Sequence, residues 1–343
     1  MNTTEEKQMK NPLGYKSEKG LLFQFAVPSI IAMLVGSLYN IVDQFFIGHS
    51  VGELGNAATN ISFPLSISCV AISLLFGIGG ASAFNISMGA GEKKKAVYYL
   101  GNSAVMLFSC GIVLCVITLM FLEPLLRFFG SPNNVLDYAK TYTGIIAFGF
   151  PFLILTTGGG HLIRADGRPK VSMICNLTGA IVNTFLDALF VFGLNMGMRG
   201  AALATIIGQV LSAIMVIWCL SHCKTVVIGK ENLRVRKKII SRIISLGTAP
   251  FSNQLAMMVV QIVMNKSLKY YGSISVYGEA VPIACAGIIT KVNQVFMSFV
   301  IGISQGLQPI TSFNYGAKKY KRVKTAYTFA IKCGFALAVV AFL

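Results

Sequence analysis

Charged residues are scarce in this chain, and acidic residues are among the scarcest. Only 12 of its 343 residues are Asp or Glu, 3 are His and 1 is Trp. The charged fraction of 12% is about half that of a soluble domain, which argues against a soluble fold. The sequence also contains no Walker A motif and no His-Glu-x-x-His. These absences exclude ATP-driven export by this chain and argue against a zinc peptidase.

The chain is rich in long runs of apolar residues. The hydrophobic fraction is 55% and the mean hydropathy is +0.69. A membrane-spanning helix needs about 20 mostly apolar residues, so the sequence predicts an all-α polytopic membrane protein. The first run is too long for a signal peptide, and we expect it to remain as a signal anchor. The predicted spans are 21–47, 57–88, 97–121, 141–163, 170–192, 200–221, 243–264, 279–305 and 325–343.

The basic residues are unevenly distributed between the connections. The formal net charge is +17, and 22 of the 29 Lys and Arg fall in the N-terminal tail and in every second connection. Cytoplasmic connections carry such an excess, which places the N-terminus in the cytoplasm. This topology explains the basic patches without a nucleic-acid partner.

An internal repeat divides the chain. Residues 77–97 resemble residues 302–323, with Gly89 aligned on Gly316. Repeated groups of helices are typical of transporters. The second group has three predicted helices where the first has six, so we expect about three further helices beyond residue 343. The predicted parts are a cytoplasmic tail (1–20), a six-helix bundle (21–221), a basic linker (222–242) and an incomplete second bundle (243–343).

Two carboxylates stand well inside the predicted spans. Asp43 lies in the first span and Asp187 in the fifth, and neither helix supplies a Lys or Arg partner. An ionised carboxylate in a bilayer costs several kcal/mol, so it persists where it meets water, a cation or a proton. The pair predicts a transporter with a cation site.

Polar side chains on the same helices can complete that site. Tyr39 shares a helix face with Asp43, and Asn183 shares one with Asp187. Thr205 lies early in the sixth span, at a similar depth. Their oxygens suit Na⁺, and two close carboxylates also suit a proton. The alternative for Asn176, Asn183 and Thr205 is that they only hydrogen-bond neighbouring helices.

Other polar residues are candidates for a substrate cleft. Asn176 and Gln209 lie on the polar faces of the fifth and sixth spans, and Lys291 is a cation deep within the eighth. Lys291 either contacts substrate or an aspartate, or faces a wet cleft without a specific role. The 14 Met and 24 Phe would suit a cleft that repacks around varied apolar drugs.

The motifs resemble the multidrug and toxic compound extrusion (MATE) family, and within it a bacterial branch of multidrug export proteins. The resemblance is carried by VPSIIAMLVGSLYNIVDQFFIG, IRADGRPK, NTFLDALFVFG and GISQGLQPITSFNYGAKKYKRV. It implies a MATE-type fold of two pseudo-symmetric six-helix bundles around a central cleft. It also implies a cation site whose residues correspond here to Asp43, Asn183, Asp187 and Thr205, with Tyr39 nearby. Some members use an acidic residue in the seventh helix, where this chain has Gln254, which we keep only as a cleft candidate.

We therefore expect a secondary active transporter and no enzyme. It would be a monomeric antiporter without a cofactor that exports cationic or amphipathic drugs across the bacterial plasma membrane in exchange for Na⁺ or H⁺. The alternative is a flippase of lipid-linked saccharides in the same superfamily. A flippase should have a cationic cavity, and the first-half spans contain no Lys or Arg in their interior. An intramembrane enzyme would need a nucleophile and base facing the aspartates, and none is found.

Overall fold

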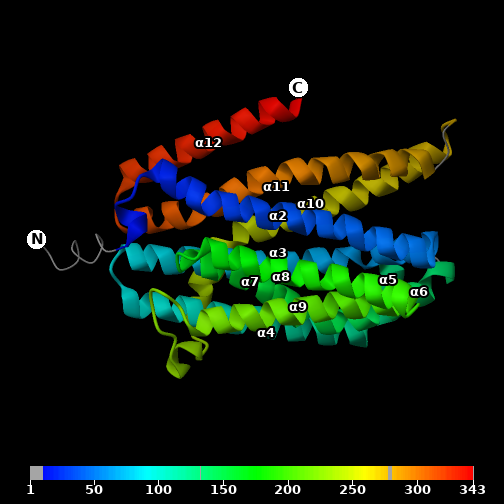
Figure 1. Cartoon of the computed structure of the whole chain (residues 1–343), viewed down its shortest axis with the longest axis horizontal. Coiled ribbons are helices and arrows are strands. Elements are labelled where there is room, and N and C mark those ends of the chain that lie inside the picture. Colours follow the sequence, from blue (N-terminus) through cyan, green and yellow to red (C-terminus); the bar gives the residue numbers. More distant parts are fainter. Residues whose placement is uncertain (1–10, 132, 277–279, 343) are drawn as a thin grey trace, which may run out of the picture.

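The described part of the chain is helical throughout and contains no strand (Figure 1). The computed structural model describes residues 11–131, 133–276 and 280–342. The predicted all-α class is confirmed. The long helices are α2 (Glu18–Val51), α3 (Glu53–Gly89), α4 (Lys93–Met120), α6 (Asn133–Ile146), α7 (Phe150–Ala165), α8 (Pro169–Asp187), α9 (Gly197–Ser221), α10 (Lys237–Ser273), α11 (Ala280–Gly316) and α12 (Tyr320–Phe342). The short elements are η1 (Pro12–Gly14), α5 (Leu122–Phe128), η2 (Ala147–Gly149), η3 (Ala188–Gly193) and η4 (Lys230–Leu233).

Each predicted span corresponds to a helix. Among the described residues, eight helical segments are long and apolar enough to cross a membrane, and α11 covers residues 280–305 of the eighth predicted span. The fourth span begins at Asn133 and not at 141, because α6 continues through η2 into α7 as one helical rod. Helices α10 and α11 each reach 37 residues and overrun their predicted spans. Hydropathy detects only the apolar middle of a helix, so polar helical ends were missed.

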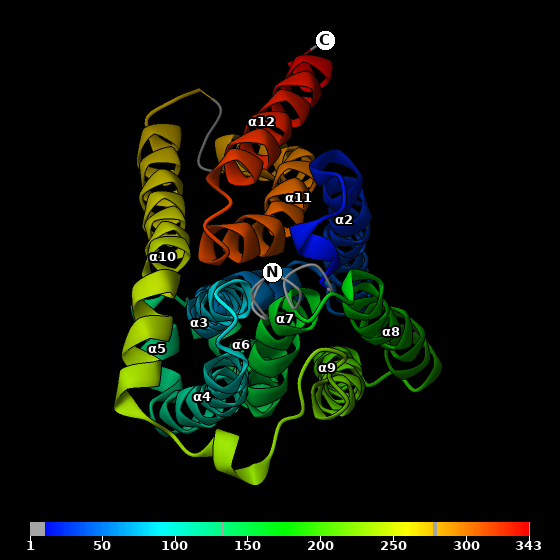
Figure 2. The same ribbon diagram turned by 90° about the vertical axis from the view of Figure 1, so that its left-hand side faces the viewer.

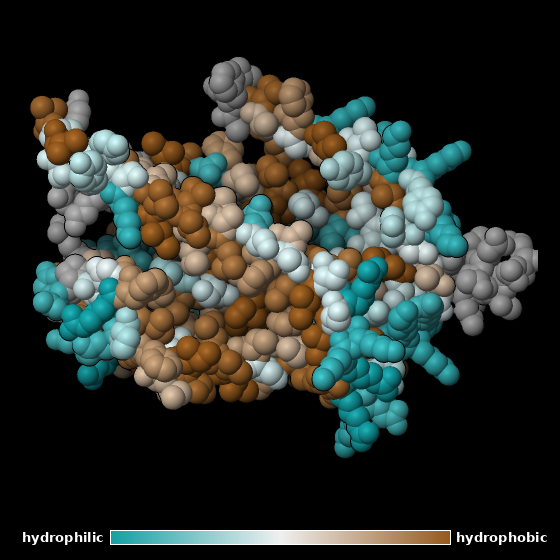
Figure 3. Space-filling model, turned by 180° about the vertical axis from the view of Figure 1, so that it is seen from behind, coloured by the Kyte–Doolittle hydropathy of each residue, from teal (hydrophilic) through white to brown (hydrophobic). Residues whose placement is uncertain are grey.

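The helices are arranged around α3. Figure 2 shows α4 and α7 on one side of α3, with α10 and α11 on the other. The ends of the bundle differ in charge. The segment before α2 and the α3–α4, α7–α8, α9–α10 and α11–α12 connections gather at one end, which we call the basic end. Figure 3 shows an apolar band across one face of the molecule between hydrophilic ends, as expected for a multi-pass membrane protein.

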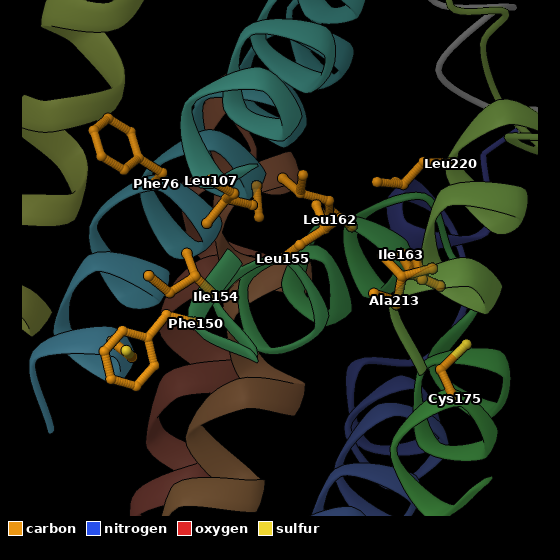
Figure 4. Packing of buried hydrophobic residues seen from close by; sticks show 14 of the residues in the cluster. Phe76, Leu107, Phe150, Ile154, Leu155, Leu162, Ile163, Cys175, Ala213 and Leu220 are labelled. Carbon is orange, nitrogen blue, oxygen red and sulfur yellow. The ribbon is translucent and has the colours of Figure 1, made fainter. Parts of the chain in front are cut away.

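Helix α7 lies in the middle of the hydrophobic core. Its Ile154, Leu155 and Leu162 are buried, and Figure 4 shows Leu162 beside Leu107 of α4. Nearly every residue of α7 is buried. A helix that is apolar all round is expected in the centre of a bundle.

Glycines bring α3 close to α11 at the basic end. A Cβ on Gly89 would overlap the carbonyl oxygen of Phe313, and a Cβ on Gly316 would overlap that of Ile86. Gly89 and Gly316 are partners in the internal repeat, so equivalent positions of the two repeats meet each other. Small residues permit such close approach between membrane helices.

A buried carboxylate fixes the turn between α7 and α8. Asp166 is fully buried and accepts hydrogen bonds from the backbone N–H of Lys224 (2.7 Å) and of Thr225 (2.9 Å). It also pairs with Arg168 at 2.8 Å. The turn itself needs Gly167, whose φ is +85°. Asp166 therefore ties the turn to the segment that leaves α9.

Asp166→Ala is expected to destabilise the protein by about 3 kcal/mol, because it leaves Arg168 and two N–H groups without their acceptor. The measurement is the apparent unfolding temperature in detergent. Asp137→Ala, at an exposed position, is the matched control. Equal unfolding temperatures for the two variants would contradict the structural role of Asp166.

Candidate functional site

Three helices bring polar side chains together in the half of the bundle away from the basic end. Helix α2 contributes Tyr39 and Asp43, and α8 contributes Asn183 and Asp187 at its last turn. Helix α9 contributes Thr205. The structure thus assembles the five residues that the sequence predicted as a cation site. Asp43, Asn183, Asp187 and Thr205 are buried, with exposed fractions of 8%, 2%, 1% and 7%.

The two carboxyl groups lie against each other. Asp43 and Asp187 are close enough for a direct hydrogen bond when one of them carries a proton. No ion pair within the described ranges involves either residue. Two buried like charges repel each other, so the pair is stable only when a proton or cation compensates it.

The amide and hydroxyl groups are connected to this pair. The Asn183 Nδ2 donates to Thr205 Oγ1 at 3.3 Å, and Thr205 donates to the carbonyl of Ala201 at 3.0 Å. The Tyr39 hydroxyl interacts electrostatically with Asp43 and Asp187. The bond from Asn183 to Thr205 joins α8 to α9, so the interhelical alternative describes part of what Asn183 and Thr205 do.

Several oxygens of the cluster nevertheless receive no hydrogen bond from the described groups. They are Asp43 Oδ1, Asn183 Oδ1 and both carboxylate oxygens of Asp187. Unpaired buried acceptors are unusual in folded proteins. No group of three or more His, Cys, Asp and Glu is found among the residues described, so a transition-metal site has no support there. Carboxylate, amide and hydroxyl oxygens fit a hard cation such as Na⁺.

The backbone changes pitch directly after Asp187. Residues 188–193 form a π-helical turn, with Leu194 donating its N–H to the carbonyl of Leu189. Such turns inside helices are frequent at functional sites. The turn places Phe192 against Phe46 of α2, with ring centroids 5.3 Å apart.

Tyr142 is a member of the cluster that sequence reasoning missed. It lies on α6, is 8% exposed, and interacts electrostatically with Asp43, Tyr39 and Asp187. The predicted fourth span began at 141, which placed Tyr142 at its end, where tyrosines are common. Its place on the buried stripe of α6 was the available signal.

The predicted cleft residues do not join this cluster. Asn176 lies two turns nearer the basic end and donates to the carbonyl of Ser172 at 3.2 Å. Gln209 lies one turn from Thr205, and its Oε1 lies against Gly149. Gln254 is half-buried on α10, a helix that packs on α3, α4 and α11. The side chain of Lys291 lies outside the described residues.

Fold and site together define a polytopic helical membrane protein with a buried, oxygen-rich cluster between its helices that fits a cation. A model of the MatE family matches residues 28–189 and 251–343, and the chain belongs to that family. The resemblance found in the sequence motifs is therefore confirmed.

The chain is similar to curated multidrug export proteins. It is 27% identical over 305 residues to multidrug export protein MepA of Staphylococcus haemolyticus, covering 89% of this chain and 66% of that protein. It is 26% identical over 316 residues to MepA of Staphylococcus aureus, covering 91% and 68%. The chain thus spans about two thirds of the length of these relatives.

Solved structures share the fold. A multidrug resistance MATE family transporter of the MOP superfamily, in an outward-facing conformation, superposes with a TM-score of 0.87 at 23% identity, covering 100% of this chain and 74% of that one. A MOP superfamily transporter from Pyrococcus furiosus, described as having a binding pocket of reversed polarity, gives 0.86 at 22%, with the same coverage. The predicted MATE-type fold is confirmed.

Asp187→Asn is expected to stabilise the protein in sodium-free alkaline buffer by on the order of 1 kcal/mol or more, because it removes the repulsion with Asp43. Any rise in unfolding temperature caused by Na⁺ should disappear in the same variant. The measurement is thermal unfolding in NaCl and in choline chloride, with Asp137→Asn as the exposed control. Destabilisation by Asp187→Asn in sodium-free buffer would show that the carboxylate is structural.

Proposed function

We propose that the chain forms the site-bearing part of a cation-coupled antiporter that exports cationic or amphipathic drugs across a bacterial plasma membrane. The observation that carries the proposal is the pair Asp43 and Asp187, buried without a positive partner and with unpaired oxygens. Membership of the MatE family and the similarity to multidrug export proteins support it. The excess of Lys and Arg supports a cytoplasmic basic end.

Coupling follows from competition for the charge of the pair. When Na⁺ or H⁺ compensates Asp43 and Asp187, the site loses its attraction for an organic cation. When the cation leaves, the attraction returns. Because linkage is reciprocal, a bound drug must weaken cation binding by the same factor. The same carboxylates therefore serve import of the cation and release of the drug.

Alternating access requires the basic end to open. Helices α2 and α11 meet through Ser37 and Ser298, whose hydroxyl oxygens are 2.9 Å apart. Helices α3 and α11 meet through Ser82 and Gln308, where the amide donates at 2.9 Å. Both contacts join parts of the chain that belong to different repeats, and they would have to separate for a drug to enter from the basic end.

The flippase alternative is less well supported. A lipid-linked saccharide carries phosphate, and its site should present Lys or Arg to the cavity. No Lys or Arg among the described side chains takes part in the cluster around Asp43. The neighbour from Pyrococcus furiosus, with its reversed pocket polarity, indicates that a related fold can hold a different charge pattern.

Ethidium efflux tests the antiporter. Vesicles that carry the protein are given a Na⁺ gradient or a pH gradient separately, and we expect one of them to drive efflux. Asp187→Asn should abolish it, since a single remaining carboxylate cannot alternate between drug and cation. Asp137→Asn should transport as the unmodified protein does. Undiminished efflux in Asp187→Asn would reject the proposed site, and absence of efflux under either gradient would favour the flippase.

A cross-link tests the opening of the basic end. Ser82→Cys and Gln308→Cys are combined in a protein whose eight native cysteines have been replaced. Oxidation should join α3 to α11 and stop efflux, and a reducing agent should restore it. Each single cysteine variant is the control. Efflux that continues at full rate while the cross-link is complete would show that this contact does not open.

A further inference from the structure

The connection between α9 and α10 is held in one place on the bundle. We call residues 224–238 the basic strap. Asn102 of α4 is fully buried, and its Nδ2 donates to the carbonyls of Asn232 (3.0 Å) and Arg234 (3.1 Å). Its Oδ1 accepts from the N–H of Arg236 at 2.9 Å. One side chain of α4 therefore binds three backbone groups of the strap.

Further contacts fix the orientation of the strap. The Arg236 guanidinium lies 3.9 Å from the ring centre of Tyr98 and donates to its hydroxyl at 3.0 Å. Val226 is buried and Ile228 packs against the core, whereas Val227 between them is 84% exposed. The strap thus has an inner face that packs on the bundle and an outer face.

The outer face combines positive charge with apolar side chains. Its exposed basic residues are Lys224, Lys230, Arg234, Lys237 and Lys238, and Glu231 is the one exposed acidic residue of the strap. Leu233 and Val235, at 42% and 56% exposure, alternate with them. A run of charges that is merely solvated needs neither exposed aliphatic side chains nor a buried anchor. Basic and apolar residues on one surface are typical of segments that lie at a membrane interface.

The strap lies where lipid headgroups would be. Figure 2 shows η4 at the outer rim of the bundle, beyond α4 and away from α12. Figure 3 shows hydrophilic residues at this end directly beside the apolar band. Trp218 at the end of α9 is 63% exposed, as expected for an aromatic residue at a membrane interface.

We propose that the basic strap is a binding surface for anionic phospholipid headgroups in the leaflet at the basic end. The charges would contact the phosphates, and Val227, Leu233 and Val235 would enter the region of the upper acyl chains. Juxtamembrane clusters of four to eight Lys and Arg bind anionic lipid in this way. The strap is hydrogen-bonded to α4 and runs directly into α10. Bound lipid would therefore hold the start of α10 and the neighbouring end of α4 at the membrane surface.

Trp218 is the single tryptophan of the chain and reports on the lipid beside the strap. The protein is reconstituted in vesicles of equimolar phosphatidylglycerol and phosphatidylcholine, with brominated acyl chains on one lipid or the other. Bromine quenches a nearby indole. We expect brominated phosphatidylglycerol to quench Trp218 more strongly than brominated phosphatidylcholine, and the excess to vanish at high salt, where headgroup contacts are screened.

Matched variants locate the effect. Lys230→Gln with Arg234→Gln and Lys238→Gln should lower the preference for the anionic lipid by at least about fivefold. Lys318→Gln with Lys321→Gln and Lys324→Gln removes the same charge from exposed positions near α12 and should leave it unchanged. An apparent unfolding temperature in detergent equal to that of the unmodified protein confirms that the strap variant is folded. Equal quenching by both lipids in the unmodified protein, or an unchanged excess in the strap variant, would overturn the proposal.

Discussion

Repulsion between two buried carboxylates is the interaction on which the candidate site depends. Asp43 and Asp187 come from helices that are far apart in sequence, and the packing of α2 on α8 keeps them together. A Lys or Arg partner would neutralise the two carboxylates permanently. Without one, the charge of the pair must be compensated by a bound proton or cation. Helix α2 also carries Ser37, which meets Ser298 of α11. A change of charge at Asp43 therefore acts on the helix that contacts the other repeat.

The contacts between the two repeats are typical of an interface that can separate. In a bilayer the surrounding lipid is as apolar as the helices, so association rests on close fit and a few hydrogen bonds. Gly89 and Gly316 give such a fit because they let the backbones of α3 and α11 contact each other directly. The hydrogen bond from Gln308 to Ser82 adds one polar contact. Neither of these two contacts is an ion pair. The repeats are also joined at the basic end by the pair of Glu18 in α2 and Arg322 in α12, at 3.1 Å.

The sequence predicted the spans and five site residues because both leave strong signals. Twenty apolar residues in a row are characteristic of a membrane helix, and a carboxylate in the middle of them is costly enough to indicate a function. Tyr142, the π-helical turn after Asp187 and the start of α6 at Asn133 were missed. Tyrosines near span ends are common, and hydropathy does not distinguish a π-helical turn from an α-helical one. A polar stripe does not tell which of its residues face the aspartates, so a cleft role for Asn176 and Gln209 stays a prediction.

The basic strap shows how a strong sequence signal can have two causes. Its charges satisfy the rule that sets membrane orientation, and that rule requires no fixed conformation. Ordering a connection loses backbone entropy of about 1–2 kcal/mol for each residue. Asn102 satisfies three backbone groups of the strap and so offsets part of that loss. An anchor of this kind has no purpose for orientation alone, since a disordered basic loop would orient the chain equally well. The order of the strap therefore points to a surface whose charges must face one direction.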